Sequence, residues 1–119
     1  MKGSLFDSNV IIEALHGRPE AVQVVETTAD RYISAVSWVE VMVGVEKSLS
    51  GKAAEMLPRF SFLPIDEAVA AEAAFVERRY PLSRMDALVL AGARVHNLLL
   101  ITRDQRILQV AGTQAISPY

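Results

Sequence analysis

Short apolar runs alternate with longer stretches of helical pattern from end to end, and this alternation limits the possible folds more than any other feature. The runs fall at residues 5–6, 31–34, 60–65 and 98–101, with a weaker one at 114–116. Short apolar strands of this kind are typical of parallel sheets that helices cover on both faces. The pattern predicts an α/β fold, a three-layer α/β/α sandwich with a short, mostly parallel central sheet of four to five strands.

Helices are expected between these runs, with ends marked by capping residues, glycine and proline. Gly17 and Pro19 separate the first two helices, and Pro81 separates the last two long ones. Gly51 is expected to separate a long helix from a short one that ends near Pro58. The expected long helices cover residues 8–15, 19–27, 37–49, 66–79 and 83–96.

The composition indicates a stable domain that needs no disulfides. The chain has 119 residues, 51% of them hydrophobic, and no cysteine. We expect one domain over residues 1–119, a length that supports a single hydrophobic core. The formal net charge of −2 argues against a surface that binds nucleic acid over its whole extent. The lack of a signal-peptide pattern and of a membrane-spanning run predicts a cytoplasmic protein.

Four acidic residues stand where the carboxyl ends of expected strands meet the starts of helices. Asp7 follows the first strand and Asp104 the fourth. Glu40 lies in the first or second turn of a helix, and Asp86 lies in the first turn of another. In an open parallel sheet, strand ends and helix starts share one edge, and binding sites form there. We therefore expect all four carboxylates along the same edge, where strand order decides whether they meet.

Each acid taken alone has an ordinary structural explanation. Ser37–Glu40 and Ser83–Asp86 have the spacing of capping boxes, and Asp7 and Asp104 suit helix N-caps. As a group they have a second explanation, because all four lie among apolar neighbours. Crowded carboxylates raise one another's pKa unless a cation is present. An all-oxygen ligand set without cysteine or histidine favours Mg²⁺ or Mn²⁺ over zinc.

Four motifs follow in order at compatible spacing: LFDSNVIIEAL, ISAVSWVEVMVGVE, PLSRMDALVLAGA and LLITRD. Over essentially the whole chain they resemble the PIN-domain nucleases, most closely the VapC-type toxins of bacterial toxin–antitoxin pairs. The resemblance implies a Mg²⁺- or Mn²⁺-dependent endoribonuclease that forms a homodimer and is held inactive by a small antitoxin protein. It also implies metal ligands at Asp7, Glu40 and Asp86, with supporting polar groups at Asn9, Ser37 and Thr102.

The fourth motif departs from the commoner pattern of that family. Many VapC-like proteins have Thr-x-Asn there, followed three residues later by an aspartate and then an aromatic residue. This chain has Asp104 in place of the asparagine, then Ile107 and Leu108 in place of the other two. We expect Asp104 to supply the fourth carboxylate. The change leaves open a second hypothesis, a PIN fold with weak or lost catalysis that acts as a binding or regulatory module.

Two further features have competing interpretations. Arg84 and Arg103 lie within two residues of a candidate acid, either as contacts to RNA phosphates or as surface residues and ion-pair partners of the acids. An aspartate after the first strand also occurs in phosphotransfer proteins, namely receiver domains and haloacid-dehalogenase-like phosphatases. The phosphatases need a second aspartate where this chain has Asn9, and receivers need an acidic pair and a late lysine that it lacks. A metal-dependent ribonuclease is therefore the preferred hypothesis.

Overall fold

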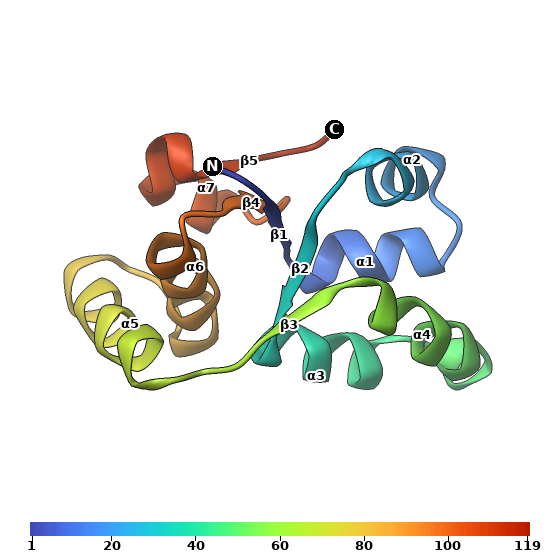
Figure 1. Ribbon diagram of the computed structural model, residues 1–119, viewed down its shortest axis with the longest axis horizontal. Helices are drawn as coiled ribbons and strands as arrows, with labels where there is room; N and C mark the ends of the chain where they lie inside the picture. The colour runs from blue at the N-terminus through green and yellow to red at the C-terminus, as the bar shows by residue number, and fades with distance from the viewer.

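A five-stranded parallel sheet forms the centre of the computed structural model, which describes all residues 1–119 (Figure 1). The strands are β1 (Ser4–Phe6), β2 (Arg31–Ser34), β3 (Ser61–Leu63), β4 (Leu99–Ile101) and β5 (Ala115–Ile116). Their order is β3-β2-β1-β4-β5, so β1 lies in the middle with β2 and β4 beside it. In this register Leu5 pairs with Tyr32 on one side and with Leu100 on the other. The predicted parallel sheet is confirmed.

Helices cover both faces of the sheet, as the three-layer prediction requires (Figure 1). Four of them pack on one face: α1 (Ser8–Leu15), α2 (Pro19–Thr27), α3 (Ala35–Gly44) and α4 (Ser50–Met56). The other face carries α5 (Glu67–Arg79), α6 (Arg84–His96) and α7 (Gln105–Ala111). Three short 3₁₀ turns complete the chain: η1 (Lys47–Leu49), η2 (Leu57–Arg59) and η3 (Gly112–Gln114). None of the helices has both the length and the apolar character that a bilayer-spanning segment needs.

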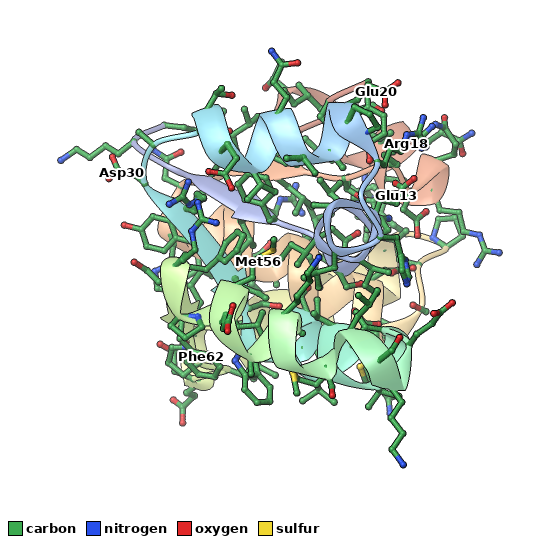
Figure 2. All side chains as sticks on the ribbon, turned by 90° about the vertical axis from the view of Figure 1, so that its right-hand side faces the viewer. Glu13, Arg18, Glu20, Asp30, Met56 and Phe62 are labelled. Carbon is green, nitrogen blue, oxygen red and sulfur yellow. The ribbon has the colours of Figure 1, made fainter.

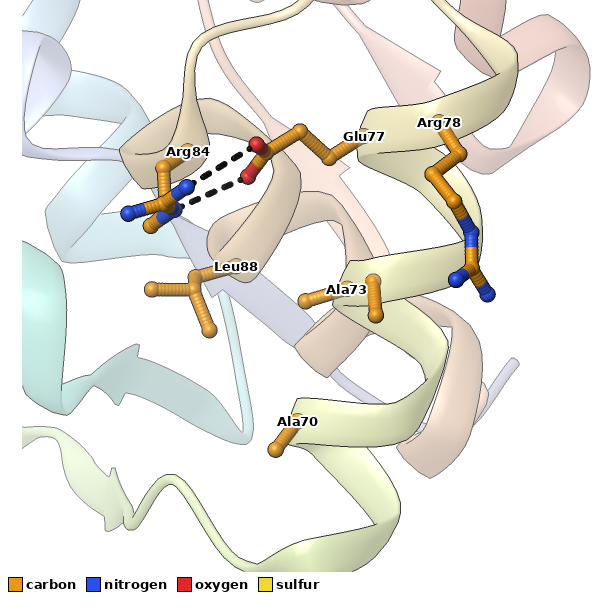
Figure 3. A pocket seen from close by; sticks show the side chains of 7 residues that line it. Ala70, Ala73, Glu77, Arg78, Arg84 and Leu88 are labelled. Carbon is orange, nitrogen blue, oxygen red and sulfur yellow. Dashed lines mark hydrogen bonds and ion pairs between the residues drawn. The ribbon is translucent and has the colours of Figure 1, made fainter.

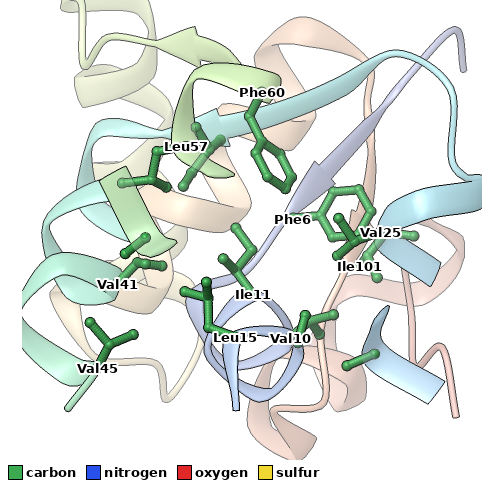
Figure 4. Close-up of a cluster of buried hydrophobic side chains, with 14 residues drawn as sticks. Phe6, Val10, Ile11, Leu15, Val25, Val41, Val45, Leu57, Phe60 and Ile101 are labelled. Carbon is green, nitrogen blue, oxygen red and sulfur yellow. The ribbon is translucent and has the colours of Figure 1, made fainter. Parts of the chain in front are cut away.

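Successive residues of β1 face opposite layers, so the sheet separates two hydrophobic cores. Phe6 belongs to a cluster of 14 buried residues shared with α1 to α4, and its ring meets that of Phe60 edge-on at 5.4 Å (Figure 4). Leu5 belongs instead to the cluster on the other face, with Leu90 of α6. Leu5 and Phe6 are both fully buried. Burial on both faces explains the continuous apolar run and holds the end of β1 firmly in the middle of the sheet.

The predicted helix over 37–49 is wrong at both ends. Helix α3 spans Ala35–Gly44, and Ser34 caps it, because the Ser34 hydroxyl accepts a hydrogen bond from the backbone N–H of Ser37 at 3.1 Å. The predicted capping box from Ser37 to Glu40 is therefore wrong, and Ser37 lies fully buried in the first turn. The helix stops where Val45 takes an extended conformation, with φ −78° and ψ 150°.

The predicted boundaries at Gly51 and around β3 also differ from the structure. Gly51 lies inside α4 and separates nothing, because η1 leads directly into α4 and the break comes earlier, at the extended Val45 and Glu46. Strand β3 is shorter than the predicted run over 60–65, since Pro64 has no N–H for the ladder. β3 is an edge strand, and its Phe62 stands at the surface with 54% of its area exposed (Figure 2).

Candidate active site

Asp7 follows the central strand β1 and is the only buried charged residue, with 6% of its surface exposed. Its Oδ1 accepts a hydrogen bond from the backbone N–H of Ser8 at 2.8 Å, which makes it the N-cap of α1. Its Oδ2 accepts a second one from the Thr102 hydroxyl at 2.7 Å. Phe6 pairs with Ile101 in the sheet, so Asp7 and Thr102 leave neighbouring strands at the same level. The capping prediction is confirmed, yet capping alone needs neither the burial nor the bond to Thr102.

The surroundings of Asp7 disfavour its charge. Burial raises the pKa of Asp7 to about 6, against the lowering effect of the hydrogen bonds from Thr102 and Ser8. The negative charges of Glu40 and Asp86 raise this pKa further. Two of the other predicted acids therefore lie within electrostatic reach of Asp7 at the carboxyl edge of the sheet, and none of the three makes an ion pair with a basic side chain.

Glu40 reaches this edge from the second turn of α3. The Ser8 hydroxyl donates a hydrogen bond to Glu40 Oε1 at 3.0 Å, which ties α3 to the start of α1. Ser8 is a residue of the site that sequence reasoning did not single out. Its position directly after Asp7 was the only signal available, and that position also suits an ordinary first helical residue.

Asp86 lies in the first turn of α6 with its carboxylate free. The Ser83 hydroxyl accepts a hydrogen bond from the backbone N–H of Asp86 at 3.2 Å, so Ser83 caps the helix as predicted. The Asp86 side chain has no hydrogen bond or ion pair of its own, and it is only half-buried. It is the most available of the candidate ligands.

Asp104 is linked to Asp7 through Thr102. Its backbone N–H donates to Thr102 Oγ1 at 3.0 Å, and Thr102 in turn donates to Asp7. Its own Oδ1 accepts from the backbone N–H of Arg106 at 2.9 Å, so Asp104 caps α7. Hydrogen bonds through Ser8 and Thr102 thus connect Asp7, Glu40 and Asp104, while Asp86 acts on Asp7 through its charge alone.

The donor chemistry fits Mg²⁺ or Mn²⁺, although the acids are not preassembled around an ion. Nowhere in the chain do three or more acidic, histidine or cysteine side chains stand in an arrangement that would hold a metal. All the candidate donors are oxygens, the set that these hard cations prefer. Asn9 Oδ1, two residues from Asp7, is the only buried side-chain nitrogen or oxygen without a hydrogen-bond partner. A cation would supply the positive charge that buried Asp7 lacks.

The two arginines singled out by sequence pair with glutamates and not with the candidate acids. Arg84 makes two hydrogen bonds to Glu77 of α5, at 3.1 and 3.2 Å, above an alanine-lined hollow between α5 and α6 (Figure 3). Arg103 donates to Glu13 of α1 at 3.2 and 3.4 Å. The expectation that these arginines pair with the acids of the site is wrong, since their partners are other glutamates. Contact with RNA phosphates stays a prediction for both arginines.

Thr102→Val is expected to lower the free energy of unfolding by about 2 kcal/mol, because it leaves the buried Asp7 carboxylate without its side-chain donor. Valine keeps the shape of threonine, so packing changes little. Thr28→Val is the matched control, since the Thr28 hydroxyl donates only to the Val24 carbonyl at the end of α2. Urea denaturation of both variants measures the difference. If Thr102→Val lowered the free energy of unfolding no more than Thr28→Val does, the claim that buried Asp7 needs the Thr102 hydrogen bond would be contradicted.

Comparison with known proteins identifies the family. Residues 4–113 match the PIN domain. The chain is 31% identical to Toxin FitB of Neisseria gonorrhoeae, with 97% of each chain covered. The match includes all four candidate acids and the strands β1 to β4, and it extends past the end of α7, so it covers the whole of the site described above.

Solved structures of toxins share the fold. A toxin–antitoxin complex from Klebsiella pneumoniae contains a chain with 33% identity and a TM-score of 0.88, with 98% of each chain covered. FitAcB from Neisseria gonorrhoeae gives 27% identity, a TM-score of 0.80 and 97% coverage of each chain. A DNA-bound VapBC from Salmonella typhimurium, at 20% identity and a TM-score of 0.79 over 98% of each chain, shares the fold alone. The chain therefore belongs to the PIN-domain family, and it resembles a toxin and a chain of a toxin–antitoxin complex over nearly its whole length.

Proposed function

We propose that this chain is a metal-dependent endoribonuclease and the toxin of a type II toxin–antitoxin pair. The observation that supports this most is the grouping of Asp7, Glu40 and Asp86 at the carboxyl edge of the parallel sheet, with Asp7 buried and its charge uncompensated. A carboxylate that is buried without a counter-charge lowers the stability of the fold, and such groups occur most often at functional sites. Capping alone does not explain Asp7. The membership in the PIN-domain family leaves the phosphotransfer hypothesis without support.

The four acids would divide the work of holding Mg²⁺ or Mn²⁺. We assign Asp7 and Asp86 to metal binding, because one is buried without a counter-charge and the other has a free carboxylate. Glu40 would serve as a third ligand or act on the attacking water, and Asp104 would complete the site. A bound divalent cation supplies a Lewis acid that offsets negative charge on the phosphate and lowers the pKa of bound water.

The chain's own hydrogen bonds orient these carboxylates. The Ser8 N–H and the Thr102 hydroxyl each hold one oxygen of Asp7, which fixes the plane of its carboxylate. The Ser8 hydroxyl holds Oε1 of Glu40 and leaves its second oxygen free. Ser8 therefore holds two acids in place, Asp7 through its backbone N–H and Glu40 through its hydroxyl. Hydrogen bonds of this kind are expected of residues that support metal ligands.

A small antitoxin is the proposed partner, since the Klebsiella pneumoniae chain that resembles this one comes from a toxin–antitoxin complex. Helix α3 offers apolar surface beside Glu40: Trp38, Val39 and Val43 are 39%, 56% and 79% exposed. A partner that covered this face would also shield Glu40 from RNA. We further propose that the chain forms a homodimer and works in the cytoplasm, where its RNA substrate is found.

One observation favours a catalytically weak binding module as the second candidate. Ile107 stands where many relatives have an aspartate, and it is fully buried in the core between α6 and α7. No acid can therefore act from that position without disturbing the core. If Asp104 does not replace the missing charge, the site would bind metal weakly and cleave slowly.

The test is the cleavage of a panel of structured RNAs, including tRNA, by the purified protein with Mg²⁺, with Mn²⁺ and with EDTA. We expect cleavage with either cation, none with EDTA, and recovery when metal is added in excess. Asp86→Asn, purified in parallel, detects contaminating ribonucleases, because cleavage that survives in this variant does not come from the proposed site. No cleavage of any RNA, together with no thermal stabilisation by Mn²⁺, would support the binding module instead.

A further inference from the structure

A second charged cluster lies beside the site and is centred on Glu13 of α1. Arg18 donates to Glu13 Oε2 at 2.6 Å, and Arg103 donates to the same oxygen at 3.2 Å. The Tyr119 hydroxyl donates to Oε1 at 2.8 Å. Glu13 thus joins the turn after α1 to two segments far away in sequence, the one after β4 and the one after β5. Figure 2 shows Glu13 and Arg18 close together at one edge of the molecule.

The aromatic ring of Tyr119 strengthens this cluster. The guanidinium carbons of Arg18 and Arg103 both lie 4.5 Å from the ring centroid, a distance at which cation–π attraction operates. Burial and the hydrogen bond to Glu13 raise the pKa of Tyr119 to about 12, so its hydroxyl remains a donor at neutral pH. Burial acts to raise the pKa of Glu13, but the hydrogen bonds from Tyr119 and Arg18 outweigh it and lower that pKa. Glu13 and Tyr119 therefore keep the charge states that their contacts need.

The cluster is connected to the site through Arg103. This residue lies between Thr102 and Asp104, both of which belong to the hydrogen-bond network of Asp7. The Thr102 backbone is held on its other side by β5, since its N–H donates to the Ile116 carbonyl at 3.1 Å. Arg103 has no such backbone anchor, and its side chain is held by Glu13 and Tyr119. Within the segment 102–104, Arg103 is therefore the residue that the Glu13 cluster holds.

We propose that Glu13 is a positioning residue of the site: through Arg103 it holds the segment 102–104 so that the Thr102 hydroxyl orients Asp7 for metal binding. The inference rests on the proposed function, because it assigns Glu13 a role in the same metal site. A structural alternative is that the cluster merely fastens the segment after β5 to the domain. The two differ in what they predict for a folded variant. Only positioning predicts weaker metal binding in a protein that is still fully folded.

The test compares Glu13→Gln with Glu26→Gln, in the full chain and at a temperature where both are folded. Glu26 is a matched control, because it also makes two hydrogen bonds to an arginine, to Arg59 at 3.0 and 2.8 Å, but lies on α2 away from the acids. Calorimetric titration with Mn²⁺ alone is expected to show about a 10-fold weaker dissociation constant for Glu13→Gln, the size typical of lost groups that orient metal ligands. Glu26→Gln is expected to bind Mn²⁺ as the unmodified chain does.

Two further readouts separate positioning from simple loss of stability. In Glu13→Gln the Asp104 amide should exchange its hydrogen faster, because its bond to Thr102 Oγ1 loosens. With an RNA that the unmodified chain cleaves, kcat should fall while KM stays within about twofold, since the change acts on the metal ligands and not on RNA contacts. Tyr119→Phe, which keeps the ring and removes the hydroxyl, should show a smaller loss in the same direction.

Three outcomes would overturn the proposal. Mn²⁺ binding by Glu13→Gln equal to that of the unmodified chain removes the link to the site. Equal losses in Glu13→Gln and Glu26→Gln, in proportion to their thermal stability, indicate a structural role only. A raised KM with unchanged kcat indicates that Arg18 and Arg103 act on RNA directly. If the unmodified chain itself binds no Mn²⁺, it is the proposed metal site that fails, and this result is distinguishable from the other three.

Discussion

Asp7→Asn is expected to lower the rate of metal-dependent RNA cleavage by at least about 10³-fold, which corresponds to about 4 kcal/mol of lost transition-state stabilisation. Asparagine has nearly the shape of aspartate but lacks the charge that would pair with a cation. Its amide group also cannot accept both of the hydrogen bonds that Ser8 and Thr102 donate to Asp7. Single-turnover cleavage of a labelled RNA at saturating Mn²⁺ measures the effect.

Asp66→Asn is the matched control for this prediction. Asp66 also caps a helix, since its Oδ1 accepts a hydrogen bond from the Val69 N–H at 3.0 Å at the start of α5. It is exposed and lies outside the group of candidate acids. If Asp7 were only a helix cap, the two variants would behave alike. We expect Asp66→Asn to cleave within about twofold of the unmodified chain, as a modest loss of helix stability leaves the folded site intact.

The parts of the fold that could be predicted from sequence are those with local signals. Pro19 begins α2, Ser83 caps α6, and each stands next to the boundary that it marks. The start of α3 has no such signal, because Ser34 and Ser37 are both serines and both suit a cap. Pairing of Ser34 with Leu63 in the neighbouring strand keeps β2 intact up to Ser34 and leaves this residue as the cap. That choice depends on a strand almost thirty residues away and is invisible locally.

Some features of the candidate site could likewise be predicted from sequence, and others could not. Asp7, Glu40 and Asp86 could be predicted to lie at one edge because the geometry of a parallel sheet decides this without contact information. The bond from Ser8 to Glu40 could not, as it requires α3 to pack beside α1. Nor could the partner of Arg103 be found, because Glu13 lies 90 residues earlier in the chain. Long-range packing chooses between partners that look equivalent in sequence.

The contribution of Asp7 to the stability of the metal-free protein is expected to fall as the pH rises from 4 to 6. Its pKa is 3.8 in the unfolded chain and about 6 in the folded one. The folded state therefore binds the proton more tightly, and the stabilising contribution of the protonated side chain is fully present below pH 3.8 and lost as the pH rises through 6. A difference of about two pKa units corresponds to about 3 kcal/mol at neutral pH.

The difference in unfolding free energy between Asp7→Asn and the unmodified chain isolates this contribution. Other groups titrate equally in both proteins, so their effects cancel, while asparagine does not titrate. Urea denaturation in EDTA at several pH values should show the variant gaining about 3 kcal/mol relative to the unmodified chain between about pH 3 and pH 7, about 2 kcal/mol of it between pH 4 and pH 6. Mn²⁺ added at pH 7.5 should stabilise only the unmodified chain and reduce the gap, because the cation relieves the buried charge. A difference independent of pH would mean that the folded protein tolerates the Asp7 carboxylate without a cation, and the physical reason for placing a metal there would be gone.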